Sequence, residues 1–246
     1  MPEAWGAAFA YALQIYFDFS GYSDMALGAA LLLGIRIPKN FDNPLRSLSI
    51  TEFWRRWHIS LSNFITTYLY TPIVRSFGRV TPANSAKATI LAMTIAGLWH
   101  GPNWTFVIFG AAHGVALAVN QYWKKKKKSL PDPIAWLLMM AFICFAFIFF
   151  RSPNLSVARQ MLAGAVGLHS LSGFGVLLES FRSARLTVGL PALVGCLVAF
   201  FGPSSNKLAE EYRLSPTLAC GVAGMILVAF LFMNSSNATE FVYVAF

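Results

Sequence analysis

The chain alternates between long apolar runs and short polar segments. The apolar runs cover residues 5–19, 25–33, 88–99, 104–119, 134–150, 186–201 and 217–233. A helix that crosses a bilayer needs about 20 apolar residues, because each residue rises 1.5 Å through a hydrocarbon core of about 30 Å. The pattern therefore predicts an all-α, polytopic membrane protein whose single transmembrane domain covers residues 1–246.

Two interruptions predict broken or re-entrant helices. Residues 16–24 place polar side chains and Gly21 between the first two runs, where either a broken helix lining a cavity or a plain loop is expected. Pro102 interrupts the charge-free stretch 88–123. Because proline removes a backbone donor and clashes with the preceding turn, a helix should kink or end beside His100.

An amphipathic helix at the membrane interface is predicted over residues 53–65. Ser49 and Glu52 have the spacing of a capping box at its start. One helical face then carries Trp54, His58, Leu61 and Ile65. Two tryptophans and two arginines suit a helix that lies in the interface.

Composition supports a membrane environment. The chain is 57% hydrophobic and only 12% charged, whereas a soluble domain carries about a quarter charged residues. This excludes an ordinary soluble globule, a disordered tail and a coiled coil. The net charge of +9 lies mostly between the apolar runs, including five lysines at 124–128. A lipid bilayer is thus the expected partner, and nucleic acid is not. The lysines favour a cytoplasmic side, but basic residues at 151–185 leave the topology open.

Histidines are the candidates for chemistry, because an ionisable group inside a membrane segment is costly and usually functional. His100 lies between Gly97 and Gly101, and its neutral imidazole could accept a proton from a hydroxyl near pH 7. The alternative is a core histidine bonded to a neighbour. His58 could orient a substrate or anchor its helix. His113 could support His100 or serve helix packing, and the remaining histidine, at position 169, is expected to be inert.

Metal and cofactor sites are not predicted. His100 and His113 are spaced nearly as haem ligands on one helix would be, but the Gly-Pro between them spoils that geometry. No carboxylate pair suits a metalloenzyme, and the P-loop, G-x-S-x-G and dinucleotide motifs are absent. The cysteines lie inside apolar runs without C-x-x-C spacing, so neither a disulfide nor a zinc site is expected.

Four motifs in order resemble the membrane-bound O-acyltransferase (MBOAT) superfamily. They are YFDFSGYSDM at 16–25, FDNP at 41–44, SITEFWRRWHISLS at 49–62 and GLWHG at 97–101, and the ending FVYVAF at 241–246 is also similar. The branch is the alginate O-acetyltransferase-like one, which is related to the D-alanyl transfer protein of teichoic acid modification. The likeness covers the whole chain but only the C-terminal half of a family protein, so further N-terminal spans are expected upstream. Thr66 and Thr67 depart from the Arg-Asp that the family usually has there.

The resemblance implies a transfer of an acyl group from a thioester donor, such as acetyl-CoA, to a hydroxyl, with no bound cofactor. His100 would be the general base and His58 would position or polarise the reacting groups. Candidate substrate-binding residues are Trp54, Trp57, Trp99 and His113. The acceptor would be an exopolysaccharide, reached through a periplasmic partner protein at the bacterial inner membrane. The alternatives are D-alanyl or other acyl transfer, or a truncated non-catalytic membrane protein or assembly subunit.

Overall fold

The computed structural model describes all residues except 1, 128, 169–189, 212–214 and 234–246. Its described residues form helices and contain no strand, which confirms the all-α prediction. The chain divides into two units, Met1–Gly202 and Pro203–Phe246. Within the second unit the helices are α11 (Ser205–Glu211) and α12 (Pro216–Met233). The histidine at 169, the residues 186–189 of one predicted run and the aromatic ending lie outside the described residues.

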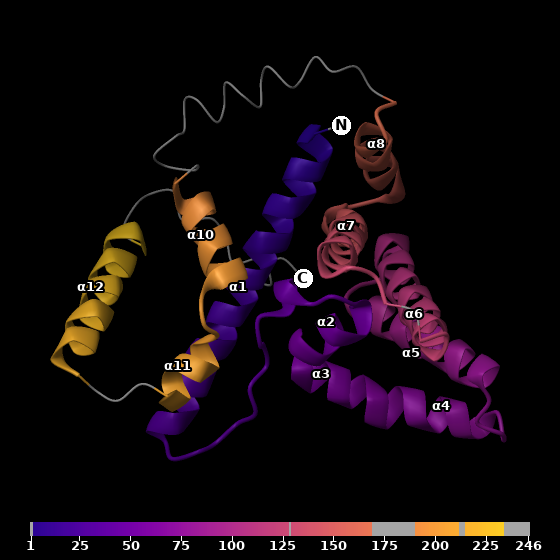
Figure 1. Cartoon of the computed structure of the whole chain (residues 1–246), viewed down its shortest axis with the longest axis horizontal. Helices are drawn as coiled ribbons and strands as arrows, with labels where there is room; N and C mark the ends of the chain where they lie inside the picture. The colour runs from indigo at the N-terminus through magenta and orange to yellow at the C-terminus, as the bar shows by residue number, and fades with distance from the viewer. Residues whose placement is uncertain (1, 128, 169–189, 212–214, 234–246) are drawn as a thin grey trace. The chain divides into compact units, whose positions relative to one another are not determined.

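The first unit begins with a single long helix, α1 (Pro2–Leu32), shown in Figure 1. The predicted interruption at residues 16–24 is therefore wrong. No proline lies between Pro2 and Leu32, so every backbone donor there is available to the helix. A single glycine such as Gly21 costs a helix only about 1 kcal/mol. Helix α1 also makes tertiary contacts. One is a hydrogen bond, 3.0 Å long, from Trp5 Nε1 to the carbonyl oxygen of Ala165 in α8 (Leu155–Ala165).

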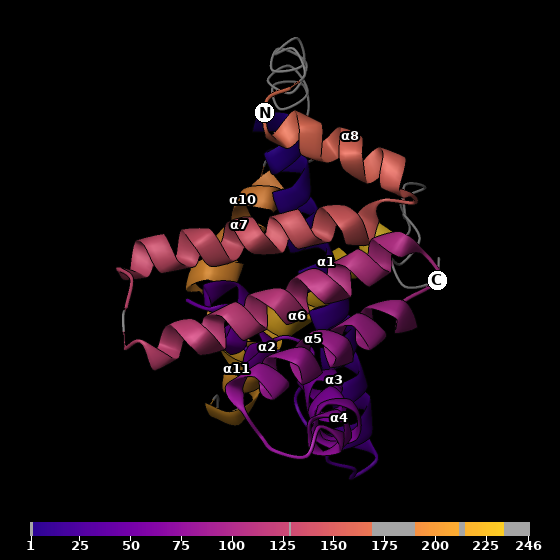
Figure 2. The same ribbon diagram turned by 90° about the vertical axis from the view of Figure 1, so that its right-hand side faces the viewer.

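Helices α5 (Pro82–Trp99), α6 (Trp104–Lys125) and α7 (Asp132–Arg151) lie side by side (Figure 2). The turn between α5 and α6 contains Pro102, as the sequence predicts. Gly97 and Gly110 allow the two backbones to touch. A Cβ atom on Gly110 would lie 2.2 Å from the carbonyl oxygen of Met93, and one on Gly97 would lie 2.3 Å from that of Phe106. Gly97 and Gly110 are therefore the points of closest approach that these contacts identify between α5 and α6.

Helix α7 has the length and apolar character of a membrane span. It is the only helix among the described residues that meets both criteria. Half of its most apolar stretch is buried against the rest of the protein. Its buried face includes Ile143, Phe147 and Phe150. The ring of Phe147 contacts Tyr11 of α1, and that of Phe150 contacts Phe109 of α6. Helix α7 therefore supplies much of the core that surrounds the candidate site.

The predicted continuous helix over residues 53–65 is wrong. It is broken at Trp57 and His58 into α2 (Ile50–Arg56) and α3 (Ile59–Phe64). After the break the helical backbone continues through a π-helical turn (Ile65–Tyr70) into α4 (Thr71–Ser76). Single π-helical turns inside longer helices are often found at functional sites. The face that includes Leu61 and Ile65 packs on Ala92, Met93 and Ala96 of α5.

A short 3₁₀ turn, Pro44–Arg46, fastens the segment before α2 to other helices. Trp136 Nε1 on α7 donates to the carbonyl oxygen of Leu45 over 2.9 Å. The Arg46 guanidinium donates to the carbonyl oxygens of Ala199 and Gly202, at the end of α10 (Leu190–Phe201). These bonds hold the FDNP segment in place beside α2. The position of His58 depends on this segment.

Candidate active site

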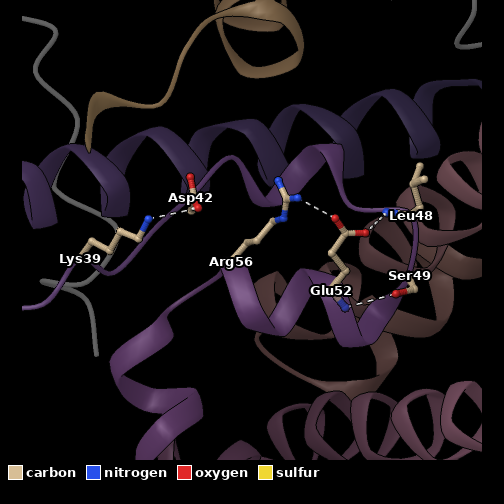
Figure 3. A network of polar contacts seen from close by, with 6 residues as sticks. All are labelled: Lys39, Asp42, Leu48, Ser49, Glu52 and Arg56. Carbon is tan, nitrogen blue, oxygen red and sulfur yellow. Dashed lines mark hydrogen bonds and ion pairs between the residues drawn. The ribbon is translucent and has the colours of Figure 1, made fainter. Parts of the chain in front are cut away.

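Polar contacts fix the start of α2, as Figure 3 shows. Ser49 Oγ accepts a hydrogen bond from the backbone N–H of Glu52 at 3.2 Å, which confirms the predicted N-cap. The Glu52 carboxylate accepts from the backbone N–H of Leu48 at 2.9 Å, one residue earlier than in a standard capping box. It also pairs with Arg56 at 2.7 Å, one turn along the helix. Both ends of α2 are thereby held, immediately before His58.

His58 has a left-handed backbone, with φ 43° and ψ 57°. This conformation is uncommon for residues other than glycine, and histidine adopts it more readily than most. Two backbone hydrogen bonds to the preceding segment hold the break open. Ile59 N–H donates to the carbonyl oxygen of Asn40 at 3.0 Å, and Asp42 N–H donates to that of Arg56 at 2.9 Å. The tertiary contacts therefore turn the His58 side chain out of the predicted helical face.

Asn40 is the functional candidate that the sequence reasoning missed. Its Oδ1 accepts from Ser60 N–H at 3.1 Å and from Ser60 Oγ–H at 3.0 Å, and it lies 3.2 Å from His58 Nδ1. The Ser60 amide can only donate, so the Asn40 atom that faces it is the side-chain oxygen, and an unprotonated Nδ1 would face that oxygen lone pair to lone pair. Ser60 Oγ also lies 3.3 Å from Nδ1, but its proton is used in the hydrogen bond to Oδ1. We infer that His58 carries its proton on Nδ1, which leaves Nε2 as the free base nitrogen.

His100 lies at the predicted helix break, directly after α5. Four aromatic rings surround it, with ring centroids 5.0 to 6.3 Å away, and they belong to Trp99, Phe106, Phe109 and Phe150. This apolar setting disfavours a positive charge. Burial lowers the pKa of His100 from 6.5 to about 4, so the imidazole is neutral at pH 7.

The two histidines lie at opposite ends of one aromatic cluster. Successive ring contacts of 4.7 to 6.1 Å connect His58 to His100 through Phe19, Phe41, Trp57, Phe147 and Phe109. Burial, and secondarily the nearby His100, lowers the pKa of His58 to about 4. Both imidazoles are therefore neutral at pH 7.

Trp54 and His113 form a second pair, with ring centroids 5.4 Å apart. His113 is only 1% exposed and its Nδ1 lies 2.9 Å from the carbonyl oxygen of Phe109, to which it donates within its own helix. Trp54 lines a cavity of about 390 Å³ between α2, α3, α5 and α6. Its buried Nε1–H has no hydrogen-bond partner among the described residues. The cavity also includes Ile59 and Ser62, which follow His58, but neither His58 nor His100 lines it.

The other two candidate substrate-binding residues differ in exposure. Trp57 is 6% exposed and stacks on Phe53 inside the core. Trp99 is 67% exposed and adjoins the ring of His100. Trp99 is therefore accessible beside the histidine, whereas Trp57 supports the cluster from within. In the described part of the chain, no three His, Cys, Asp or Glu side chains come together in a group that could hold a metal ion.

Residues 3–152, which include both helix breaks, match the profile of the membrane-bound O-acyltransferase family, MBOAT. The chain is a member of this family. This match confirms the resemblance drawn from the sequence motifs. MBOAT proteins are integral membrane proteins.

Several curated relatives are similar over much of the chain. A peptidoglycan O-acetyltransferase of Helicobacter pylori is 34% identical over 99% of this chain and 49% of its own length. A probable alginate O-acetylase, AlgI, of Pseudomonas aeruginosa is 40% identical over 81% of this chain and 38% of its own length. A teichoic acid D-alanyltransferase of Streptococcus thermophilus is 36% identical over 51% of this chain and 31% of its own length. The MBOAT chain described here thus spans half or less of the length of these relatives.

Proposed function

We propose that this chain carries the reaction centre of a membrane O-acyltransferase that O-acetylates a glycan of the bacterial cell envelope. The observation that carries the proposal is the pair of neutral histidines, each at a helix break, at the two ends of one aromatic cluster. Membership of the MBOAT family, with O-acetyltransferases of peptidoglycan and alginate among its relatives, supports the reaction class.

In this mechanism His100 is the general base. Its free nitrogen accepts the proton of the acceptor hydroxyl while the oxygen attacks the carbonyl carbon of an acyl thioester, such as acetyl-CoA. The new C–O bond forms and the C–S bond breaks. The imidazolium then returns its proton to the departing thiolate, so that the products are an ester and a thiol. General-base assistance of this kind contributes about 10²–10⁴-fold to a rate.

His58 has a positioning role in this proposal. Because Asn40 holds the proton on Nδ1, Nε2 is a hydrogen-bond acceptor, and it orients the acceptor glycan by binding a second hydroxyl while the reacting hydroxyl donates to His100. Trp54 would supply a hydrogen-bond donor, whereas His58 Nε2 is an acceptor. The unpartnered Nε1–H of Trp54 can donate to a carbonyl or hydroxyl oxygen of a substrate in the adjoining cavity. Trp54→Phe keeps an aromatic side chain but removes this donor, so KM should rise several-fold while kcat stays nearly unchanged.

The deciding experiment introduces His100→Ala at the chromosomal locus and measures ester-linked acetate on purified envelope glycans. O-acetylation should fall at least 100-fold, and the same substitution at the histidine in position 169 should leave it unchanged. Unaltered acetylation in the His100→Ala strain, with normal protein abundance, would refute the role of His100. Loss of D-alanyl esters in place of acetyl esters would favour a second candidate function, D-alanyl transfer. The likeness to a D-alanyltransferase over half of the chain supports that alternative.

The proposal extends to the setting of the reaction. The protein would reside in the cytoplasmic membrane and pass its acyl group toward an exopolysaccharide or peptidoglycan acceptor by way of an extracytoplasmic partner protein. Crosslinking in intact cells, followed by identification of the captured envelope proteins, tests the partner separately from the chemistry of His100.

A further inference from the structure

A groove of about 700 Å³ lies between α6 and α7, beside the turn that joins them. One face of each helix lines it, Leu48, Ser49 and Ile50 at the start of α2 form a third wall, and Ser129 and Leu130 of the turn complete the lining. The α6 face consists of Ala116, Val119, Asn120, Trp123 and Lys124, and the α7 face consists of Asp132, Ala135, Leu138, Met139 and Phe142. Neither His58 nor His100 belongs to this groove, so its occupant does not touch the two histidines of the proposed reaction.

The groove has the length and polarity to hold one lipid acyl chain. On α7 its lining runs from Asp132 to Phe142, a span of about 15 Å at 1.5 Å per residue. That is half of a hydrocarbon core of about 30 Å, or the depth of one leaflet. Val119 and Leu138 in the lining are 60% and 57% exposed, so the described protein leaves their apolar surface uncovered.

The mouth of the groove is strongly basic. Lys124 lines it, and the next three lysines follow at the end of α6 and in the turn after it. The Lys126 ammonium lies 4.9 Å above the ring of Tyr122, which is itself 62% exposed. Tyrosine and tryptophan at a helix end are typical of the headgroup level of a bilayer. The ion pairs in the described part of the chain, Lys39–Asp42 and Arg56–Glu52, do not involve these lysines. Asp132 is the acidic residue in the lining.

We propose that this groove is a binding site for one anionic phospholipid. An acyl chain lies along α6 and α7, and the phosphate lies among Lys124 and the lysines after it. Basic pockets at the ends of membrane helices bind anionic lipid headgroups in this way. A zwitterionic lipid would fill the apolar part equally well but would bring no net negative charge to the lysines, so the site should discriminate by headgroup charge.

The test measures equilibrium binding to the purified chain in a neutral detergent, with dioleoyl phosphatidylglycerol and dioleoyl phosphatidylcholine as probes. The phosphatidylglycerol should bind more tightly. Lys124→Gln together with Lys126→Gln should weaken it about fivefold for each lysine removed. Arg75→Gln together with Lys87→Gln removes two exposed cations outside the groove and is the matched control, for which no change is expected. Equal binding of the two lipids would overturn the proposal.

A second pair of variants separates a built site from a merely charged surface. Ala135→Phe puts a ring into the groove and should weaken binding of the phosphatidylglycerol by at least tenfold, although every lysine remains. Leu137→Phe, on an exposed position of α7 outside the lining, should have no effect. Val119→Phe provides an independent block at an exposed position if Ala135→Phe folds poorly. If filling the groove leaves lipid binding unchanged, or changes the oligomeric state and not lipid binding, the groove is not a lipid site.

Discussion

Replacing Gly110 by alanine tests the close packing of α5 on α6. A Cβ atom at this position would lie 2.2 Å from the carbonyl oxygen of Met93 and 2.9 Å from the Cα of Gly97, whereas ordinary contacts begin at 3.4 Å. Both neighbours are backbone atoms, so no side-chain rotation relieves the overlap. The two helices must move apart by about 1 Å, and a gap of that size forfeits a quarter to a half of the attraction of each contact it opens.

The energetic cost follows from these contacts. Overpacking in a close-packed interior costs about 1–3 kcal/mol, and the rigid backbone on both sides places Gly110→Ala at the upper end. The better helix propensity of alanine returns about 1 kcal/mol. We expect a net loss of about 2 kcal/mol. For a protein of this size that corresponds to a melting temperature about 4–8 °C lower.

Thermal unfolding in detergent, followed by circular dichroism, measures the effect. Gly28→Ala is the matched control, because a Cβ there meets nothing within 4 Å and lies in the interior of α1. The control should gain about 0.5–1 kcal/mol, so the same substitution should have opposite signs at the two positions. A Gly110→Ala protein that melts at or above the unsubstituted protein would refute the backbone contact between α5 and α6.

Three further predictions concern the segment around His58. Ser49→Ala removes the cap of α2 and should cost about 1 kcal/mol of stability, measured by the same melting experiment; an unchanged melting point would contradict the cap. Because burial lowers the pKa of His58 and His100 to about 4, both stay neutral as the pH falls from 7 to about 5, so kcat/KM should decline only as the pH approaches 4. An acid limb near 6.5, the value of free imidazole, would contradict this. Asn40→Asp places a carboxylate beside His58 Nδ1 and should raise the histidine pKa, moving that limb to higher pH, whereas Asn40→Ala should lower the rate without that shift.

Features that depend on neighbouring residues were predictable from the sequence. Pro102 interrupts an apolar stretch by its own covalent structure, and the helix does end beside it, at Trp99. Ser49 and Glu52 act within a single helical turn, and the predicted cap is present. The same reasoning misjudged residues 16–24, where polar side chains and Gly21 suggested an interruption. Such residues weaken a helix only slightly, and the contacts of α1 with α7 and α8 are available to compensate.

The break at His58 could not be predicted locally, because no proline or glycine lies between Ser49 and Ser62. The apolar spacing of Trp54, His58 and Leu61 is that of an uninterrupted helix. What opens the helix is a competing set of partners from an earlier segment, since Asn40 accepts from the amide that follows His58 and Asp42 donates to the carbonyl of Arg56. Tertiary hydrogen bonds of this kind override local preference and leave no periodic signal.

The same partners determine the chemistry of His58. The motif that contains it suggests an imidazole in the site, but a neutral imidazole has two tautomers with opposite polarity at each nitrogen. The choice depends on Asn40, 18 positions earlier, and Asn40 reaches Nδ1 only because the helix is broken. It also depends on Ser60, whose amide donates to Asn40 Oδ1 and so keeps the oxygen, not the nitrogen, of that side chain beside Nδ1. A carboxylate at position 40 would keep the same tautomer but favour the charged imidazolium, so the asparagine both orients the ring and leaves it neutral, which is the state that a hydroxyl substrate requires.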